Sequence, residues 1–100
     1  MENITDQIIE NAIGTQEVGV DFDSHDIIFV LMKDFAREYV MELNNCLNTD
    51  QGPFEKLHTD IAKRMASNDF VGIVRKHGGK RVSLNCRGQK TPCQIWVRTS

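Results

Sequence analysis

Apolar residues recur at helical spacing through residues 26–47, and this run most restricts the fold that the chain can adopt. Ile28, Leu31, Phe35, Tyr39 and Leu43 follow one another at intervals of three or four residues. That spacing places side chains on one face of an α-helix. At 1.5 Å per residue, a continuous helix of this length spans about 33 Å, enough to cross a small domain. The sequence therefore predicts one long helix as the main element.

A cluster of polar residues stands directly before this run. Either Asp23 or Ser24 is placed to cap the helix, and Asp26 lies where the positive end of the helix dipole favours an acid. Asp21 and His25 complete the cluster, but it lacks the twelve-residue calcium loop with its closing glutamate. We interpret it as a helix cap.

The N-terminal part is predicted to form a short helix and a connector. Residues 3–13 carry an apolar stripe, with Asn3 as the expected cap and Gly14 just after the end. Residues 15–23 are acidic, and their apolar residues alternate with others. This connector is therefore predicted to be either a short half-buried strand or a solvated linker.

The C-terminal part is predicted to contain two helices and a hairpin. Pro53 suits the first turn of a helix over 54–66, and residues 68–77 show the spacing of a further helix that Gly78-Gly79 ends. Residues 80–99 alternate as two strands around a basic turn over 87–92. Trp96 falls out of phase with its apolar neighbours, which indicates a half-buried rim residue or a partner contact.

A second interpretation of the segment before the hairpin remains open. Residues 71–77 are also compatible with a strand that Gly78-Gly79 joins to 80–86, since a two-residue glycine link is a hairpin signal. The C-terminal part would then be a three-stranded meander. We favour the helix because its cap, stripe and stop agree.

Charge is divided unequally between the two halves of the chain. Residues 1–50 hold eleven acidic and two basic residues, a net charge of −9, whereas residues 51–100 hold ten basic and three acidic residues, a net charge of +7. A basic half beside an acidic half indicates that one face meets a polyanion. Lysine and arginine supply the phosphate contacts that dominate affinity for DNA.

The order of helices followed by a basic hairpin resembles the winged helix-turn-helix superfamily. The resemblance covers residues 26–99, and its core is the run Asp60-Ile61-Ala62-Lys63-Arg64-Met65 with the turn and predicted helix that follow. It implies a recognition helix in the major groove and a wing on the DNA backbone. The expected DNA contacts are Lys63, Asn68, Arg75, Lys76, Lys80, Arg81, Arg87, Gln89, Lys90 and Thr91.

The cysteines and the remaining motifs indicate neither a metal site nor an enzyme. Cys46, Cys86 and Cys93 are odd in number, which argues against a closed disulfide framework. Cys86 and Cys93, with His58 or His77, lack the close spacing of a zinc knuckle. We expect free thiols, no metal, no cofactor and no catalytic residues. With no signal peptide and no membrane-length apolar run, we expect a cytoplasmic protein.

Together these features predict a single α+β domain over residues 1–100. Residues 1–23 form an acidic helix and connector, and residues 24–100 form a small winged-helix-like core with a C-terminal β-hairpin. We expect it to bind double-stranded DNA, as a small transcriptional regulator or a replication accessory protein.

The acidic helices lead to two further expectations about partners. Ile27, Val30 and Val40 lie partly outside the main apolar stripe, which suggests a homodimer through the N-terminal and long helices unless the N-terminal helix covers them. The alternative to DNA binding is a protein adaptor or inhibitor, of the kind that phages use. Its acidic half would then meet a host assembly.

Overall fold

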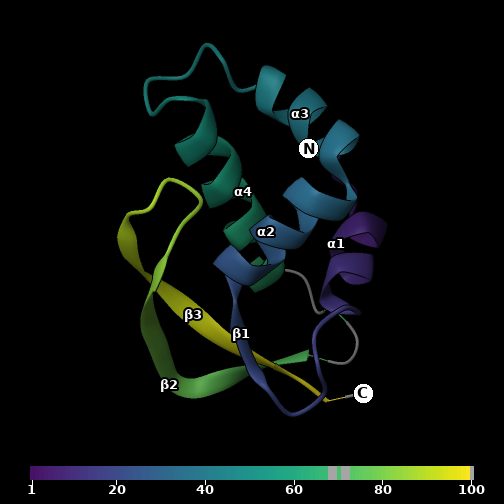
Figure 1. The fold of residues 1–100 in the computed structure, drawn as a ribbon, viewed down its shortest axis with the longest axis vertical. Coiled ribbons are helices and arrows are strands. Elements are labelled where there is room, and N and C mark those ends of the chain that lie inside the picture. The colour runs from purple at the N-terminus through teal and green to yellow at the C-terminus, as the bar shows by residue number, and fades with distance from the viewer. Residues whose placement is uncertain (68–69, 71–72, 100) are drawn as a thin grey trace.

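The computed structural model describes residues 1–67, 70 and 73–99, and the side chains of residues 71–80 lie outside this description. The fold is α+β, with helices packed on a small antiparallel sheet (Figure 1). In chain order the elements are α1 (Asp6–Ile13), β1 (Asp21–Asp23), α2 (Ser24–Asp34), α3 (Ala36–Asn44), α4 (Pro53–Ser67), β2 (Ile73–Leu84) and β3 (Lys90–Arg98). Within the described ranges, no helix is both long enough and apolar enough to cross a membrane.

The first helix is capped by Thr5, two residues after the predicted cap Asn3. The Thr5 side chain, rather than Asn3, accepts from the N–H of Ile8 at the start of α1, and Gly14 follows the last turn as expected. The backbone N–H groups of Asn3 and Ile4 are instead bound by the buried carboxylate of Glu42 on α3. A long-range contact therefore holds the segment that the local pattern assigned to the helix.

The predicted long helix is two helices. Phe35, with φ −128° and ψ 41°, lies between α2 and α3 and is not helical. A break of one residue leaves the apolar spacing intact, so Leu31 before it and Tyr39 after it both reach the core. The pattern that suggested one continuous helix is thus equally compatible with two. The predicted cap of α2 is confirmed at Asp23, which forms a capping box with Asp26.

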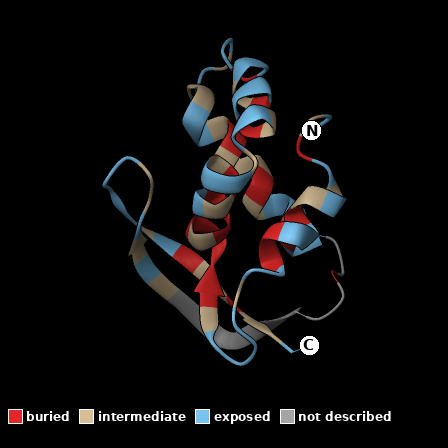
Figure 2. Ribbon diagram, turned by 45° about the vertical axis from the view of Figure 1, so that its right-hand side comes forward, coloured by how far each residue is buried: buried red, intermediate tan, exposed pale blue. Residues whose placement is uncertain are grey.

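Helix α4 confirms the prediction for residues 54–66. It begins at Pro53, and Leu57, Ile61 and Met65 are each fully buried. Only Phe54 departs from the predicted stripe, because its side chain is 38% exposed at the first turn. The hydrophobic core lies between the helices and one face of the sheet, as the distribution of buried residues in Figure 2 shows.

The segment before the hairpin is a strand, which corrects the favoured helix. Residues 73–77 belong to β2, which continues through Gly78-Gly79 to Leu84 and pairs with β3 on both sides of an irregularity between Arg75 and Lys80. The glycines therefore accommodate a change of register, neither ending a helix nor making the two-residue hairpin link of the alternative interpretation. Residues 68–69 and 71–72 lie outside the described part of the chain.

The sheet has the order β1-β3-β2, all antiparallel. The connector thus includes a strand as one alternative predicted, although only residues 21–23 form it. Phe22 pairs with Trp96, and both are buried in the core. Trp96 is 7% exposed, so its expected place at a half-buried rim is wrong. Packing of the sheet against the helices, which strand alternation alone does not encode, buries the indole.

Of the three apolar residues outside the main stripe, Ile27, Val30 and Val40, the core covers two and leaves one exposed. Ile27 is fully buried and Val30 packs against the core, in agreement with the contact between α1 and α2. Val40 is 60% exposed. Two of the three residues that suggested a dimer are thus covered within the chain.

Candidate functional site

The tip of the β2–β3 hairpin is an ordered turn over residues 85–89. The side-chain oxygen of Asn85 accepts hydrogen bonds from the N–H groups of Arg87 at 2.9 Å and of Gln89 at 3.0 Å. The backbone of Asn85 also pairs with Gln89 and Gly88, and the φ of 76° at Gly88 favours glycine there. A basic turn joins the two strands as predicted, but it lies at 85–89 instead of 87–92, because Lys90, Thr91 and Pro92 belong to β3.

Three of the expected DNA contacts lie together at this tip. Arg87, Gln89 and Lys90 are all exposed. Neither Arg87 nor Lys90 makes an ion pair with any described residue, so both charges face solvent. Thr91, the next expected contact, is half-buried, and its hydroxyl lies 3.1 Å from Nε2 of His25. Thr91 therefore faces the interior and the other three do not.

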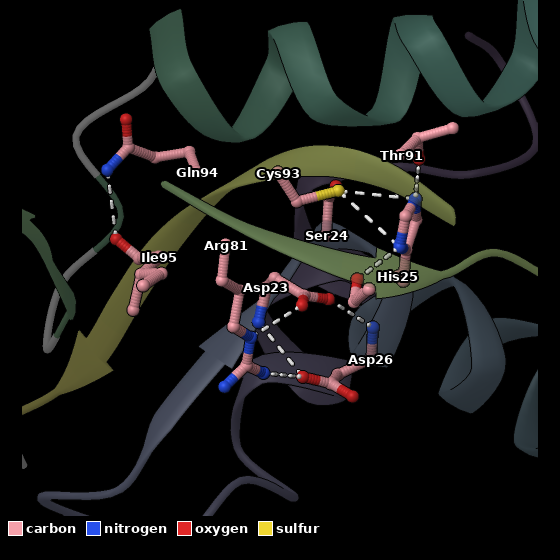
Figure 3. Close-up of polar contacts among 10 residues, drawn as sticks. Asp23, Ser24, His25, Asp26, Arg81, Thr91, Cys93, Gln94 and Ile95 are labelled. Atoms are coloured by element: carbon pink, nitrogen blue, oxygen red, sulfur yellow. Dashed lines mark hydrogen bonds and ion pairs between the residues drawn. The ribbon is translucent and has the colours of Figure 1, made fainter. Parts of the chain in front are cut away.

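Arg81 is paired with two acidic residues at the start of α2. Its Nε donates to Asp23 at 2.8 Å and its Nη2 to Asp26 at 2.9 Å (Figure 3). Burial opposes ionisation of Asp23, but hydrogen bonds from Arg81, Ser83 and the Asp26 N–H outweigh it, so the pKa of Asp23 lies below its ordinary value. These contacts fasten the hairpin to the start of α2, and they neutralise a charge that we expected to meet DNA.

The other expected contacts are less fully defined. Lys63 is exposed on α4. Arg75, Lys76 and Lys80 belong to β2, with side chains outside the described part, and Asn68 lies outside the described residues altogether. The structure thus gathers Arg87, Gln89 and Lys90 and separates them from Arg81 and Thr91, although Arg81 and Thr91 are on the same hairpin.

A cleft of about 420 Å³ separates the hairpin from the helices, and we call it the hairpin cleft. Residues from α2, α4 and the hairpin line it. They are Ser24, His25, Ile28, Glu55, His58, Thr59, Ala62, Ala66, Asn85, Arg87, Gln89, Thr91, Pro92, Cys93, Gln94 and Trp96. Arg87 and Gln89 therefore connect the exposed tip with the cleft.

His58 forms the α4 side of the hairpin cleft. Its Nε2 lies 2.7 Å from the hydroxyl of Tyr39, and the Cys86 sulfur lies 4.0 Å from the same ring. Burial, together with the nearby His25 and Arg87, lowers the pKa of His58 to about 4. Burial also raises the pKa of Tyr39 to about 12 and raises that of Cys86. These groups are consequently neutral at pH 7.

His25 forms the opposite side, where it joins α2 to both strands of the hairpin. Its Nδ1 lies 2.6 Å from the Ser83 hydroxyl, and its Nε2 lies 3.2 Å from the Cys93 sulfur (Figure 3). The Ser24 hydroxyl lies 3.4 Å from the same sulfur. His25 and Cys93 are both buried. Among the described residues, Asp23, His25 and Cys93 are the group whose ligand atoms could hold a metal, all within 4.8 Å of one another.

The sequence analysis does not predict this cluster. It places His25 in the cap cluster before the long apolar run, and it considers Cys93 together with Cys86. His25 and Cys93 are 68 positions apart, and only the pairing of β1 with β3 brings them together. No spacing of ligands in the sequence signals such a contact.

The three cysteines are free thiols, as predicted.

Comparison of the chain with protein-family models, with curated proteins and with solved structures finds no match. The functional argument therefore rests on the geometry of the hairpin tip and of the hairpin cleft.

Proposed function

We propose that this protein binds double-stranded DNA through the tip of its β2–β3 hairpin. The observation that carries the proposal is that residues 70–100 contain seven basic and no acidic residues. This segment forms the hairpin, and its tip exposes Arg87 and Lys90. Exposed cations on an ordered turn suit contact with phosphates, and arginine at such a tip also suits a narrow minor groove.

The position of the acidic helices supports the same surface. In Figure 1 the hairpin tip and the acidic helix α1 lie on opposite sides of the molecule. Of the acids near the hairpin, Asp23 and Asp26 are paired with Arg81, and Glu55 on α4 lines the hairpin cleft with Arg87. The tip carries the two charges of Arg87 and Lys90 against this one acid, so we expect it to be positive, and repulsion keeps the acidic side away from a polyanion.

Helix α4 takes the place of the recognition helix in this proposal. The resemblance to winged helices requires a helix directly before the hairpin, and residues 73–77 are a strand. Helix α4 is the preceding described helix, and the hairpin tip lies beside its first half, where the Cys86 sulfur is 4.0 Å from the His58 ring. Lys63 is exposed further along the same helix. DNA is expected to meet the hairpin tip, with Lys63 as an additional contact on α4. A transcriptional regulator and a replication accessory protein are both consistent with such a contact.

The test compares two double variants that carry the same net charge. Arg87→Ala with Lys90→Ala removes two charges from the tip, and Lys33→Ala with Arg37→Ala removes two exposed charges from the acidic helices. Fluorescence anisotropy with a short duplex measures affinity between roughly 50 and 200 mM salt. We expect the parent to lose affinity steeply over this range. In a plot of log affinity against log salt concentration, the slope of the tip variant should be smaller in magnitude by about 2.

The control variant should retain the slope of the parent, and both variants should melt at nearly the same temperature because exposed charges contribute little to folding. Equal loss in the two variants would mean that only total charge matters. Absence of binding by the parent at low salt would rule out the proposal.

A protein partner is the second candidate, and exposed apolar residues favour it. Phe29 on α2, and Val40 and Met41 on α3, are 43%, 60% and 45% exposed on helices rich in acids. A second copy of the chain or a basic host protein would cover them. A pull-down before and after nuclease treatment separates the candidates. A protein retained after treatment supports the partner, and loss on treatment supports DNA.

A further inference from the structure

Asp23, His25 and Cys93 bring an oxygen, a nitrogen and a sulfur ligand together at the base of the hairpin cleft. All three residues are buried, at 1%, 8% and 8% exposure, and their ligand atoms lie within 4.8 Å of one another. From this arrangement we propose that the protein binds one divalent ion of the zinc class through Cys93 Sγ, His25 Nε2 and the Asp23 carboxylate.

The surroundings of His25 orient its ring for this role. The Nδ1 atom lies 2.6 Å from the Ser83 hydroxyl, and Ser83 in turn hydrogen-bonds the Asp23 carboxylate. Histidines that bind metals almost always donate the second ring N–H to such a partner, which selects the tautomer and holds the ring. With Nδ1 as the donor, Nε2 carries the lone pair, and it is the ring nitrogen nearer to the Cys93 sulfur, at 3.2 Å. The Thr91 hydroxyl lies 3.1 Å from Nε2, so an ion has to displace this hydroxyl from the lone pair.

The separations are close to those that a tetrahedral ion requires. Zinc bonds of about 2.3 Å to sulfur and 2.0–2.2 Å to nitrogen and oxygen place neighbouring ligand atoms roughly 3.4–3.6 Å apart at the tetrahedral angle. The Cys93 sulfur and His25 Nε2 are already within 0.4 Å of this range at 3.2 Å. The widest separation of 4.8 Å has to shorten by about an ångström, which side-chain rotation can supply.

The Asp23 carboxylate has a lone pair left to offer to an ion. Its oxygens accept from the Asp26 N–H at 3.1 Å, from Arg81 at 2.8 Å and from the Ser83 hydroxyl, which together occupy three of the four carboxylate lone pairs. Ligating carboxylates are commonly hydrogen-bonded in this way.

The ligand set selects the class of ion, and the hairpin cleft provides access. Thiolate and imidazole suit zinc and related transition metals, whereas calcium and magnesium take oxygen ligands. Ser24, His25 and Cys93 line the cleft, so an ion can enter there. On binding, the Cys93 S–H bond breaks, a sulfur–metal bond forms and the proton is released to solvent. The Ser24 hydroxyl, 3.4 Å away, can donate to the thiolate.

Cobalt is the probe, because its spectrum reports thiolate ligation directly. The full chain, stripped of metal and reduced, is titrated with Co²⁺. We expect a thiolate-to-cobalt charge-transfer band in the near ultraviolet and visible bands of a four-coordinate ion, which saturate at one equivalent. Zinc should displace the cobalt. Binding should weaken as the pH falls, because protons compete for the thiolate.

Three cysteine variants assign the site. Cys93→Ser should abolish the charge-transfer band, whereas Cys46→Ser, at a buried thiol after α3, and Cys86→Ser, at the thiol beside His58, should retain it. Retention of the band in Cys93→Ser, or its loss in Cys86→Ser, would overturn the assignment.

A measurement on the unaltered chain covers the case in which Cys93→Ser does not fold. Zinc should slow alkylation of Cys93 by iodoacetamide at least tenfold, with Cys46 and Cys86 as internal controls in the same mass spectra. Absence of a cobalt band in the parent, or equal alkylation of Cys93 with and without zinc, would exclude the site.

Discussion

Glu42 on α3 fastens the N-terminal segment to the domain, and its charge is expected to matter for stability. The residue is 4% exposed, and its carboxylate accepts from the N–H groups of Asn3 at 2.6 Å and Ile4 at 3.2 Å. A weaker hydrogen bond of 3.4 Å comes from the Asn45 amide. Glu42→Gln keeps the size and one acceptor oxygen but removes the negative charge from these contacts.

The magnitude follows from the two backbone hydrogen bonds. A hydrogen bond to a charged group contributes about 1.5–3 kcal/mol, and one between neutral groups about 0.5–1.5 kcal/mol. Because the 3.2 Å bond is the weaker of the two, we expect Glu42→Gln to lower the free energy of unfolding at pH 7 by about 1–2 kcal/mol. In a domain of this size that corresponds to a fall in Tm of roughly 5–15 °C. Urea unfolding followed by circular dichroism measures this change in free energy. Glu10→Gln, at an exposed position on α1, is the matched control.

The pH dependence separates loss of charge from loss of packing. Burial opposes ionisation of Glu42, but the Asn3 and Ile4 N–H groups and Asn45 outweigh it and lower its pKa below the ordinary 4.5. Its stabilising effect is therefore complete above pH 4.5 and is lost as the pH falls through the folded-state pKa. The difference between parent and Glu42→Gln should shrink from pH 7 to about pH 3. A difference that stays constant over this range would refute the electrostatic reasoning.

Two further predictions test the core and the hairpin cleft. Leu57→Ala should lower the free energy of unfolding by about 2–5 kcal/mol because Leu57 is fully buried, whereas Val82→Ala, at a side chain 64% exposed, should change it by less than about 0.5 kcal/mol; equal effects in urea unfolding would contradict the assigned core. His58 should titrate in NMR with a pKa of about 4, below its ordinary 6.5. The free energy of unfolding should therefore fall as the pH drops from 6.5 towards 4, and this part of the pH dependence should be absent in His58→Gln. A titration near 6.5 would place His58 in solvent.

The sequence by itself determined those elements whose signals lie within a few residues of one another. Pro53 and the spacing of Leu57, Ile61 and Met65 are sufficient for α4, because a helix places residues three and four apart on one face. The capping box of Asp23 and Asp26 and the alternation of the hairpin are equally local. The separation of charge is a property of the order of residues along the chain, and it required no structure.

The tertiary structure decided the features that depend on residues far apart in the chain. Residues 73–77 have both helical spacing and strand propensity, and pairing with β3 makes them a strand. Phe35 breaks a run whose period continues across it, since one non-helical residue shifts no apolar side chain off the core.

The same distinction between local signals and long-range contacts applies to the candidate site. The exposure of Arg87 and Lys90 could be predicted, because a turn exposes its residues wherever the hairpin packs. Arg81 was assigned to DNA because its partners, Asp23 and Asp26, lie 58 and 55 positions away. The contact between His25 and Cys93 was missed for the same reason, since sheet pairing creates it and no local pattern of residues encodes it.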